Sequence, residues 1–287
     1  MKDNVYMDNK HYINLSGLRV GIPISMYTWR IRIMKYEDLI FKIPKESTTY
    51  RDDSAFIVKQ IMDILDERKL LGDNKIILNT NLKLGLPLEN INKIAGPMIE
   101  AWAFEVFTGI RDNQNNKYNL INVEAQERLG ISDIILQFKK SDNILTGNID
   151  VKATSNDIPN SGKSPNITSF ARIRTAYIND PDFMFIILSI KHKVYSQRNQ
   201  LTNLIDGIME IVDYNAYDLK FISDEDISYN PALGTGQIQI KDIHYINYQY
   251  RTTWQMCKLL DQKYLNSSRR SFEDFYREAV KNRWIKN

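Results

Sequence analysis

The sequence predicts one domain of the α/β or α+β class, in which helices and strands are intermixed. Some segments carry apolar residues at helical spacing, and others carry them at alternate positions or in unbroken runs. The two kinds of segment follow one another along residues 34–287 without a linker rich in proline, glycine and serine and without an internal repeat. With 287 residues, 43% of them hydrophobic and 25% charged, the chain can bury a sizeable core. We therefore predict no domain boundary within residues 34–287.

The first 33 residues have a different character. They mix asparagine, tyrosine and arginine without clean periodicity, and Met34 then opens a more regular sequence. We expect residues 1–33 to be an N-terminal extension that contributes little to the fold, or the product of a start placed upstream of a native Met34.

Helical spacing predicts the first elements of the domain. Ser54 is expected to cap a helix that stops at Gly72. Its buried stripe would consist of Ile57, Ile61, Ile64 and Leu65. A short strand is expected at residues 75–78, and residues 86–90 lead into another helix. A stronger helix starts at Gly96-Pro97, and its inward stripe would consist of Ile99, Ala103, Phe104 and Phe107.

The second half of the chain continues the mixture. Residues 156–165 are rich in Asn, Ser, Gly and Pro and predict a loop, from which residues 166–168 lead into a helix. The apolar run at 183–190 predicts a central, fully buried strand. Residues 236–240 alternate like a half-exposed strand.

Two helices are expected to complete the chain. The first covers residues 254–265 and carries the single cysteine, Cys257, in a packing position. The second begins after Ser271, a helix cap with Asp274 three residues later. One cysteine excludes an intramolecular disulfide and a multi-cysteine zinc site, and the three histidines show no ligand spacing.

Residues 130–154 predict an antiparallel hairpin that gathers two carboxylates and an ammonium group. Two apolar runs flank the turn-like residues 139–143. Because side chains alternate in strands, Asp133 lies on one face of the first run. Asp150 and Lys152 share one face of the second run and leave Val151 to the core. When the polar faces coincide, the three charged groups converge.

This constellation suits a magnesium-dependent nuclease. Mg²⁺ prefers oxygen ligands and keeps several waters, so the carboxylates of Asp133 and Asp150 with the backbone carbonyl of Val151 would make an open site. The metal lowers the pKa of a bound water, and Lys152 can orient that water or stabilise the developing anion. Phosphodiester hydrolysis would follow. The alternative is a structural Asp–Lys pair on an ordinary hairpin.

The Asp-x-Lys spacing alone is unspecific. It occurs at Asp8/Lys10, Asp73/Lys75, Asp150/Lys152, Asp218/Lys220 and Asp261/Lys263. What distinguishes Asp150 and Lys152 is that they interrupt runs otherwise made of Ile, Leu, Val and Phe, with Asp133 on the preceding run.

The helix that starts at residue 96 offers a further carboxylate. Glu100 and Glu105 lie on different faces, since five residues turn about 500°, so only one can face the hairpin. Glu100 is one turn from Phe104, close to the buried stripe, where an unpaired carboxylate is costly. We expect Glu100 to be an outer catalytic carboxylate that helps to hold a metal-bound water; the alternative is a surface or salt-bridged glutamate.

The charge balance limits the kinds of partner that the protein can bind. A formal net charge of +3 is only mildly basic, so a polyanion must be met by local patches. Residues 163–198 carry six basic and two acidic residues, and residues 258–287 carry eight and four. These regions are either phosphate neighbours or ordinary solvated faces. The longest apolar run, 183–188, is far shorter than the roughly 20 residues of a membrane span, and no signal peptide is visible. We expect a cytoplasmic protein.

Together with longer stretches, these residues resemble the PD-(D/E)xK nuclease superfamily, specifically type II restriction endonucleases of the EcoRV/HincII-like branch. The resemblance runs from Met34 to the C-terminus. It is carried by KIAGPMIEAWAFEVF, NLINVEAQERLGISDIILQF, DVKATSNDIP, SGKSPNITSF, NPALGTGQIQIKDIHY and RTTWQMC.

The resemblance implies a restriction-endonuclease-like fold, with a central mixed β-sheet flanked by helices. It implies a Mg²⁺-dependent homodimer that recognises the palindrome GTTAAC in double-stranded DNA and cuts both strands in its middle, leaving blunt ends with 5′-phosphates. A two-fold protein is expected because each subunit then meets one half-site. A cognate DNA methyltransferase is expected in the same prokaryotic cell, but not as a bound subunit.

The resemblance also implies roles for residues. Asp133 and Asp150 would be metal ligands and Lys152 the catalytic lysine. Ser164 and Asn166 lie in a segment similar to a base-contacting loop, where Asn166 would meet a central purine, because an asparagine amide can bind adenine N6 and N7.

Other DNA contacts are expected on either side of that loop. Where a relative has a glutamine that wedges into DNA, this chain has Lys163, and we expect Lys163 to meet a phosphate. Asn230, Ala232 and Gln237 are similar to a second recognition segment; the alternative is that they are turn and strand residues.

Two other functions remain open at this point. The first is a repair or structure-selective nuclease with the same metal core, which would cut DNA without discrete fragments. The second is a non-catalytic DNA-binding module, which would bind DNA without cutting it at any divalent-ion concentration.

Overall fold

The computed structural model describes residues 34–127, 130–232 and 234–286. The chain separates into residues 1–38, which include a 3₁₀ turn η1 (Tyr36–Asp38), and residues 39–287. The elements that follow all belong to the second unit. The expected N-terminal extension, residues 1–33, lies outside the described residues.

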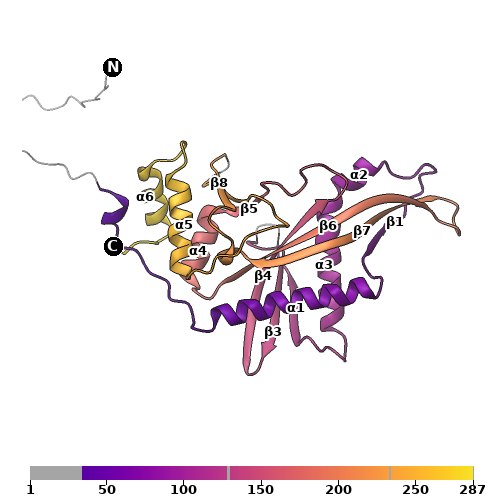
Figure 1. The fold of residues 1–287 in the computed structure, drawn as a ribbon, viewed down its shortest axis with the longest axis horizontal. Coiled ribbons are helices and arrows are strands. Elements are labelled where there is room, and N and C mark those ends of the chain that lie inside the picture. Colours follow the sequence, from indigo (N-terminus) through magenta and orange to yellow (C-terminus); the bar gives the residue numbers. More distant parts are fainter. Residues whose placement is uncertain (1–33, 128–129, 233, 287) are drawn as a thin grey trace, which may run out of the picture. The chain divides into compact units, whose positions relative to one another are not determined.

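A mixed six-stranded sheet forms the centre of the fold, in the order β1-β7-β6-β4-β3-β2 (Figure 1). Its strands are β1 (Lys75–Leu78), β2 (Leu120–Ala125), β3 (Ile134–Lys140), β4 (Asn143–Ser155), β6 (Met184–Arg198) and β7 (Ile205–Asp218). Strands β4 and β6 are parallel, whereas the other neighbouring pairs among the described strands are antiparallel. The predicted mixed sheet flanked by helices is confirmed.

Strand β6 is the buried strand that the apolar run at 183–190 predicts. It pairs with β4 on one side and β7 on the other, and Met184 to Ile190 are all buried. A strand covered on both faces has no solvent side, which is why its sequence does not alternate. Beyond residue 190 the strand continues to Arg198 in a long hairpin with β7 (Figure 1).

The predicted hairpin at residues 130–154 is formed by β3 and β4. The antiparallel register runs from Ile134 opposite Ile149 to Lys140 opposite Asn143. Ser141, in the tight turn between them, has a φ of 55°. Ile149 and Val151 point into the core, as the alternation predicts.

Helices α1 (Tyr50–Leu70) and α3 (Ala95–Arg111) pack against the core face of the sheet, and the short helix α2 (Leu88–Lys93) precedes α3. The predicted stripes are buried in both long helices, although Phe104 is only partly buried. Gly72, with a φ of 81°, follows the end of α1 as predicted.

The predicted cap of α1 is wrong. The helix begins one turn before Ser54, and Thr49 is its N-cap residue. Ser54 lies inside the helix, where its hydroxyl donates to the carboxylate of Asp218 at 2.8 Å. This partner is 164 residues away in sequence, so a local capping signal could not reveal it.

A second, three-stranded antiparallel sheet has the order β5-β9-β8. It consists of β5 (Asn166–Ser169), β8 (Ile227–Asn230) and β9 (Gln237–Ile240). The expected half-exposed strand at 236–240 is confirmed by the alternating burial of β9. As expected, residues 166–168 lead directly into a helix, which begins at Phe170. The residues themselves form β5, which pairs with β9.

Three helices gather at the end of the molecule where this small sheet lies (Figure 1). They are α4 (Phe170–Asn179), α5 (Thr253–Leu265) and α6 (Phe272–Lys281). The predicted capping box of Ser271 and Asp274 is present at α6. Cys257 is buried in α5, which confirms its packing role. Among the described residues, no helix combines the length and apolar character that a membrane crossing requires.

Candidate functional site

The hairpin places Asp133 and Asp150 opposite each other. Asp133 directly precedes β3, and its backbone N–H donates to the carbonyl of Ile149 at 2.9 Å. Its side-chain Oδ2 accepts a hydrogen bond from the N–H of Val151 at 2.7 Å. Asp133 therefore extends the ladder past its last strand pair and stands across from Asp150. The antiparallel register, set by the short turn, is what places the two acidic residues together.

Lys152 joins the two carboxylates from the same face of β4. It lies two residues after Asp150, and its Nζ is 2.8 Å from Asp150 Oδ2. The side chain of Asp150 is 6% exposed and that of Lys152 is 25% exposed. The carboxylate is thus held below the surface, whereas part of the Lys152 side chain remains open to solvent.

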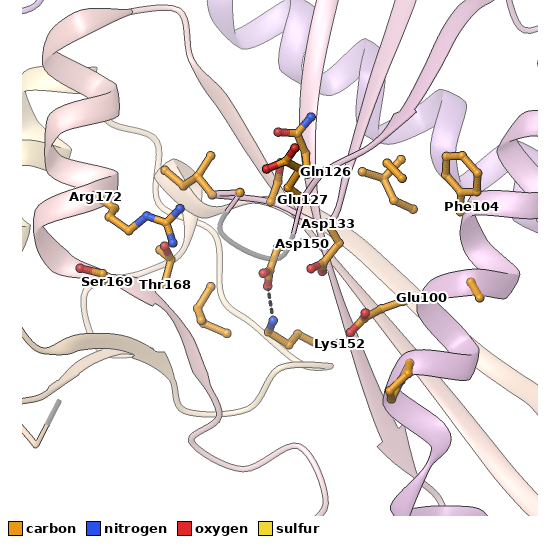
Figure 2. A pocket seen from close by; sticks show the side chains of 18 of the residues that line it. Glu100, Phe104, Gln126, Glu127, Asp133, Asp150, Lys152, Thr168, Ser169 and Arg172 are labelled. Carbon is orange, nitrogen blue, oxygen red and sulfur yellow. Dashed lines mark ion pairs between the residues drawn. The ribbon is translucent and has the colours of Figure 1, made fainter. Parts of the chain in front are cut away.

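Glu100 approaches the same charges from α3. Figure 2 shows its carboxylate directed toward Lys152 and Asp133. Burial raises the pKa of Glu100, the charge of Asp133 raises it further, and Lys152 opposes both effects. Glu105 is exposed on another face of the helix. Glu100, rather than Glu105, therefore faces the hairpin, as expected.

The cluster holds more negative than positive charge. Burial raises the pKa of Asp150 to about 7, and Asp133 and Glu100 raise it too, although Lys152 acts in the opposite direction. A carboxylate that is removed from water among other carboxylates favours its protonated form unless further positive charge arrives. A divalent cation would supply that charge.

The donor set fits a hard cation that keeps part of its water. Among the described residues, no three His, Cys, Asp or Glu side chains are arranged to hold a metal ion by themselves. Two carboxylates, those of Asp133 and Asp150, therefore need help from a backbone oxygen. The N–H of Val151 faces Asp133, and in a strand the carbonyl of the same residue lies on the same edge. Two carboxylates, this carbonyl and water are ligands of the kind that Mg²⁺ accepts.

The charged cluster lines a cleft of about 680 Å³. Helix α3 contributes Glu100 to one wall, and the other wall comes from β5, α4 and β9, with Thr168, Arg172 and Gln237. Figure 2 shows Arg172 on the opposite side of Asp150 from Glu100. The cleft thus lies between the hairpin of the large sheet and the small sheet.

The residues expected to contact DNA meet on the small sheet. Asn166 begins β5, Asn230 ends β8, and Gln237 begins β9 opposite Asn230. Ser164, with a φ of 50°, precedes β5, and the backbone N–H of Ala232 donates to the side chain of Asn230 at 3.0 Å. Two segments about 65 residues apart in sequence therefore form one surface.

Lys163 has a partner within the protein. Its ammonium group pairs with the carboxylate of Asp242, and the two residues also form an isolated backbone bridge. The side chain of Lys163 remains 54% exposed. The pair ties the loop before β5 to the chain after β9.

Two residues of the site were not predicted from the sequence. Arg172 lines the cleft from α4, whereas its neighbour Arg174 is buried against Asp261. The helical spacing predicts α4 but does not tell the two arginines apart. Gln239, at the centre of the small sheet, contacts Ser164 and Asn166, and only its alternation with Ile238 and Ile240 pointed to an exposed side chain.

Comparisons with known proteins agree on one class. A model of the family described as type II restriction endonuclease HpaI matches residues 37–283. The type II restriction enzyme HpaI of Haemophilus parainfluenzae is 71% identical over 254 residues, which are 88% of this chain and 100% of that protein. The solved NlaIV restriction endonuclease is 15% identical, over 78% of this chain and 85% of its own, with a TM-score of 0.43.

The protein is thus a type II restriction endonuclease, an enzyme that cleaves DNA. Within this class, the chain belongs to the HpaI family. Family membership decides against the repair nuclease and against the non-catalytic binding module. Type II restriction endonucleases generally use a divalent metal ion, in keeping with the excess negative charge around Asp150.

Proposed function

We propose that the protein hydrolyses both strands of double-stranded DNA at the palindrome GTTAAC, cuts in its middle, and requires Mg²⁺. The products would be blunt ends with 5′-phosphates. The recognition sequence follows from the resemblance of the chain to its family. The observation that carries the chemistry is the meeting of Asp133, Asp150 and Lys152 in one cleft beside a sheet of amide side chains.

Each residue of the charged cluster has its own role in the proposed hydrolysis. Asp133, Asp150 and the carbonyl of Val151 would hold Mg²⁺, which neutralises phosphate charge and acidifies water when it is bound. Lys152 donates hydrogen bonds to the attacking water or to the phosphate oxygen on which charge develops. Asp150, 2.8 Å from its Nζ, holds the ammonium group in place. Glu100, whose carboxylate is directed toward the same charges, would accept a hydrogen bond from the attacking water.

The bonds formed and broken define the products. The water oxygen bonds to phosphorus while the bond from phosphorus to the 3′-oxygen breaks. The phosphate stays on the 5′-oxygen of the downstream nucleotide, and the leaving 3′-oxygen of the upstream nucleotide takes up a proton. Because a palindrome presents this linkage once in each strand, we propose a homodimer in which each subunit cuts one strand.

The cellular setting follows from the enzyme class. We propose that the protein acts in the cytoplasm of a prokaryotic cell, where foreign DNA is met. A separate DNA methyltransferase of the same sequence specificity would protect the host genome. Residues 34–287 would form the single catalytic domain, with residues 1–33 outside it.

Digestion of DNA of known sequence tests the proposal. A plasmid is incubated with the protein and Mg²⁺, and the new ends are mapped by sequencing. The expected result is discrete fragments with blunt ends inside GTTAAC, and no fragments when the divalent ion is chelated. Fragments that end at another sequence would refute the proposed site, and cutting without discrete fragments would refute site-specific cleavage.

A matched pair of variants ties the activity to the cluster. Lys152→Ala removes the lysine of the proposed site, and Lys75→Ala removes an exposed lysine at the same Asp-x-Lys spacing on β1. The first variant should lose cleavage and the second should keep it. Equal activity of the two would show that the wrong Asp-x-Lys has been assigned.

A further inference from the structure

Three amide side chains meet on the small sheet. Asn166 on β5 and Gln239 on the central strand β9 are register partners. Gln239 Nε2 lies 3.1 Å from Asn166 Oδ1, and Asn230 Nδ2 on β8 lies 3.4 Å from the same oxygen. All three residues stand on the exposed side of the sheet, with the buried Ile238 and Ile240 on the other side.

The orientation of Gln239 is fixed by a backbone group. An amide nitrogen and an amide oxygen have nearly the same shape, so their identities follow from partners that can only accept or only donate. The carbonyl of Ser164 can only accept, and it lies 2.9 Å from Gln239 Nε2. The end of Gln239 that also faces Asn166 is therefore its NH₂ group, and the atom of Asn166 that it meets must be the oxygen.

The orientation of Asn230 is fixed independently. The backbone N–H of Ala232 can only donate, and it lies 3.0 Å from Asn230 Oδ1. The NH₂ group of Asn230 is then the end that faces Asn166. Two separate backbone anchors therefore require the same arrangement, in which the oxygen of Asn166 accepts from both neighbours and its NH₂ group points away from them.

We propose that Gln239 is a positioning residue that fixes the Asn166 amide as a hydrogen-bond donor toward an acceptor atom on a base edge, the N7 atom of a purine. This inference rests on the proposed function of the cleft. It changes the expected contact, because a bidentate bond to adenine needs the Asn166 oxygen to accept from N6. That oxygen already accepts from Gln239 and Asn230, so Asn166 would detect N7 alone.

The conservative variant Gln239→Glu distinguishes a role of Gln239 in orienting the Asn166 amide from a role in packing alone. The substituted side chain has the same shape, but its carboxylate cannot donate to Ser164 or to the Asn166 oxygen. A charged acceptor at the Gln239 position, which is closer to Asn166 than the Asn230 donor is, outweighs that donor. The Asn166 amide would then turn its NH₂ group toward the new carboxylate and present its oxygen outward. The matched control is Gln262→Glu, the same substitution at an exposed position on α5.

The test is a competition between two DNA duplexes in one reaction. One carries the mapped site, and the other carries a 7-deaza purine in place of one purine at a time. For one position, wild type and Gln262→Glu should prefer the normal purine by about tenfold in kcat/KM, the size of one hydrogen bond. Gln239→Glu should reduce that preference to within about twofold while the preferences at the other purines remain.

Each outcome has a distinct meaning. An unchanged preference in Gln239→Glu, with normal cutting by wild type, would overturn this inference and leave the proposed function intact. Equal loss of preference at every purine would also overturn it, because a loosened sheet acts on all contacts. Failure of wild type to produce discrete fragments would overturn the proposed function itself. As a further check, Gln239→Glu should cause no additional loss when it is combined with Asn166→Ala.

Discussion

Two Asp-x-Lys pairs of this chain share a spacing and differ in almost everything else. Asp150 and Lys152 lie in the middle of β4 and open into the cleft. Asp218 ends β7 and Lys220 lies in the 3₁₀ turn η2 (Leu219–Phe221) that follows. The Lys152 side chain is 25% exposed, whereas that of Lys220 is fully buried.

The hydrogen-bond partners explain the difference. The carboxylate of Asp218 accepts from the hydroxyls of Tyr50 and Ser54, both at 2.8 Å, and from the backbone N–H of Lys220 at 2.9 Å. Lys220 Nζ donates to the hydroxyl of Thr253 at 3.0 Å. These groups connect α1, β7 and α5 through the protein interior.

Accessibility, rather than spacing, therefore separates the pair that we propose to act in cleavage from the pair in the protein interior. Burial lowers the pKa of Lys220 to about 8, although nearby carboxylates oppose this effect. The Lys220 side chain is fully buried, so a substrate cannot approach it, and its role is structural. Asp150 and Lys152 have fewer internal partners and face a space in which a phosphate can lie.

The largest expected effect is the loss of cleavage when the pair in the cleft is broken. Asp150→Ala should lower the single-turnover cleavage rate by on the order of 10²–10⁴-fold, because a proposed metal ligand and the partner of Lys152 disappear together. Asp73→Ala, at the exposed Asp-x-Lys of residues 73–75, is the control and should cut at the wild-type rate. A wild-type rate in Asp150→Ala would contradict the assignment.

The buried pair should affect stability instead. Lys220→Met removes the cation that lies near the buried carboxylate of Asp218 and pairs with Glu46 at 3.7 Å, and we expect the free energy of unfolding to fall by about 3 kcal/mol. Urea denaturation followed by tryptophan fluorescence measures it. A loss below about 0.5 kcal/mol, in the range of exposed positions, would mean that the interior tolerates this charge unpaired.

The pKa of Asp150 predicts a stability that depends on pH. In the folded protein the pKa is about 7, against an ordinary value of 3.8. Between these values the folded state binds more protons than the unfolded state, so stability decreases as the pH rises from about 4 to about 7. Asp150→Asn removes this penalty and should be more stable than wild type by about 1–3 kcal/mol above pH 7 in the presence of a chelator.

The same denaturation series at pH 4, 6 and 8 checks this expectation. The advantage of Asp150→Asn should vanish near pH 4, where the aspartate is protonated in both states. It should also shrink at pH 8 when a divalent ion replaces the chelator, since only wild type has the full set of ligands. An advantage that stays constant from pH 4 to pH 8 would show that titration of Asp150 is not its cause.

The smallest expected effect concerns Lys163. Because it is half exposed and paired with Asp242, its removal should change the free energy of unfolding by less than about 1 kcal/mol. As a phosphate contact, Lys163→Ala should weaken binding to all DNA sequences alike and reduce the slope of log K against log salt by about 1. Lys59→Ala, an exposed lysine paired with Asp63 on α1, is the control. Weakening confined to one sequence would contradict a phosphate contact.

The parts of the molecule that depend on neighbours in sequence could be predicted. The hairpin of β3 and β4 follows from alternation around a short turn, so Asp133, Asp150 and Lys152 could be placed together from sequence. The buried stripe of α1 follows in the same way from helical spacing.

The parts of the molecule that depend on partners distant in sequence could not be predicted. Ser54 looks like a local cap, but its hydroxyl bonds to Asp218. Residues 166–169 become a strand only because β9, about 70 residues later, pairs with them. The role of Gln239 arises from its contact with Ser164, 75 residues away.

If the open pair acts on DNA and the buried pair does not, the same substitution at the two lysines should affect cleavage differently. Lys152→Met and Lys220→Met are compared in single-turnover cleavage of one DNA with Mg²⁺, and each rate is divided by the fraction of folded protein. The cleavage rate of Lys152→Met should fall by at least 10²-fold, and that of Lys220→Met should stay within about threefold of wild type. Cleavage retained by Lys152→Met, or abolished in folded Lys220→Met, would contradict this expectation.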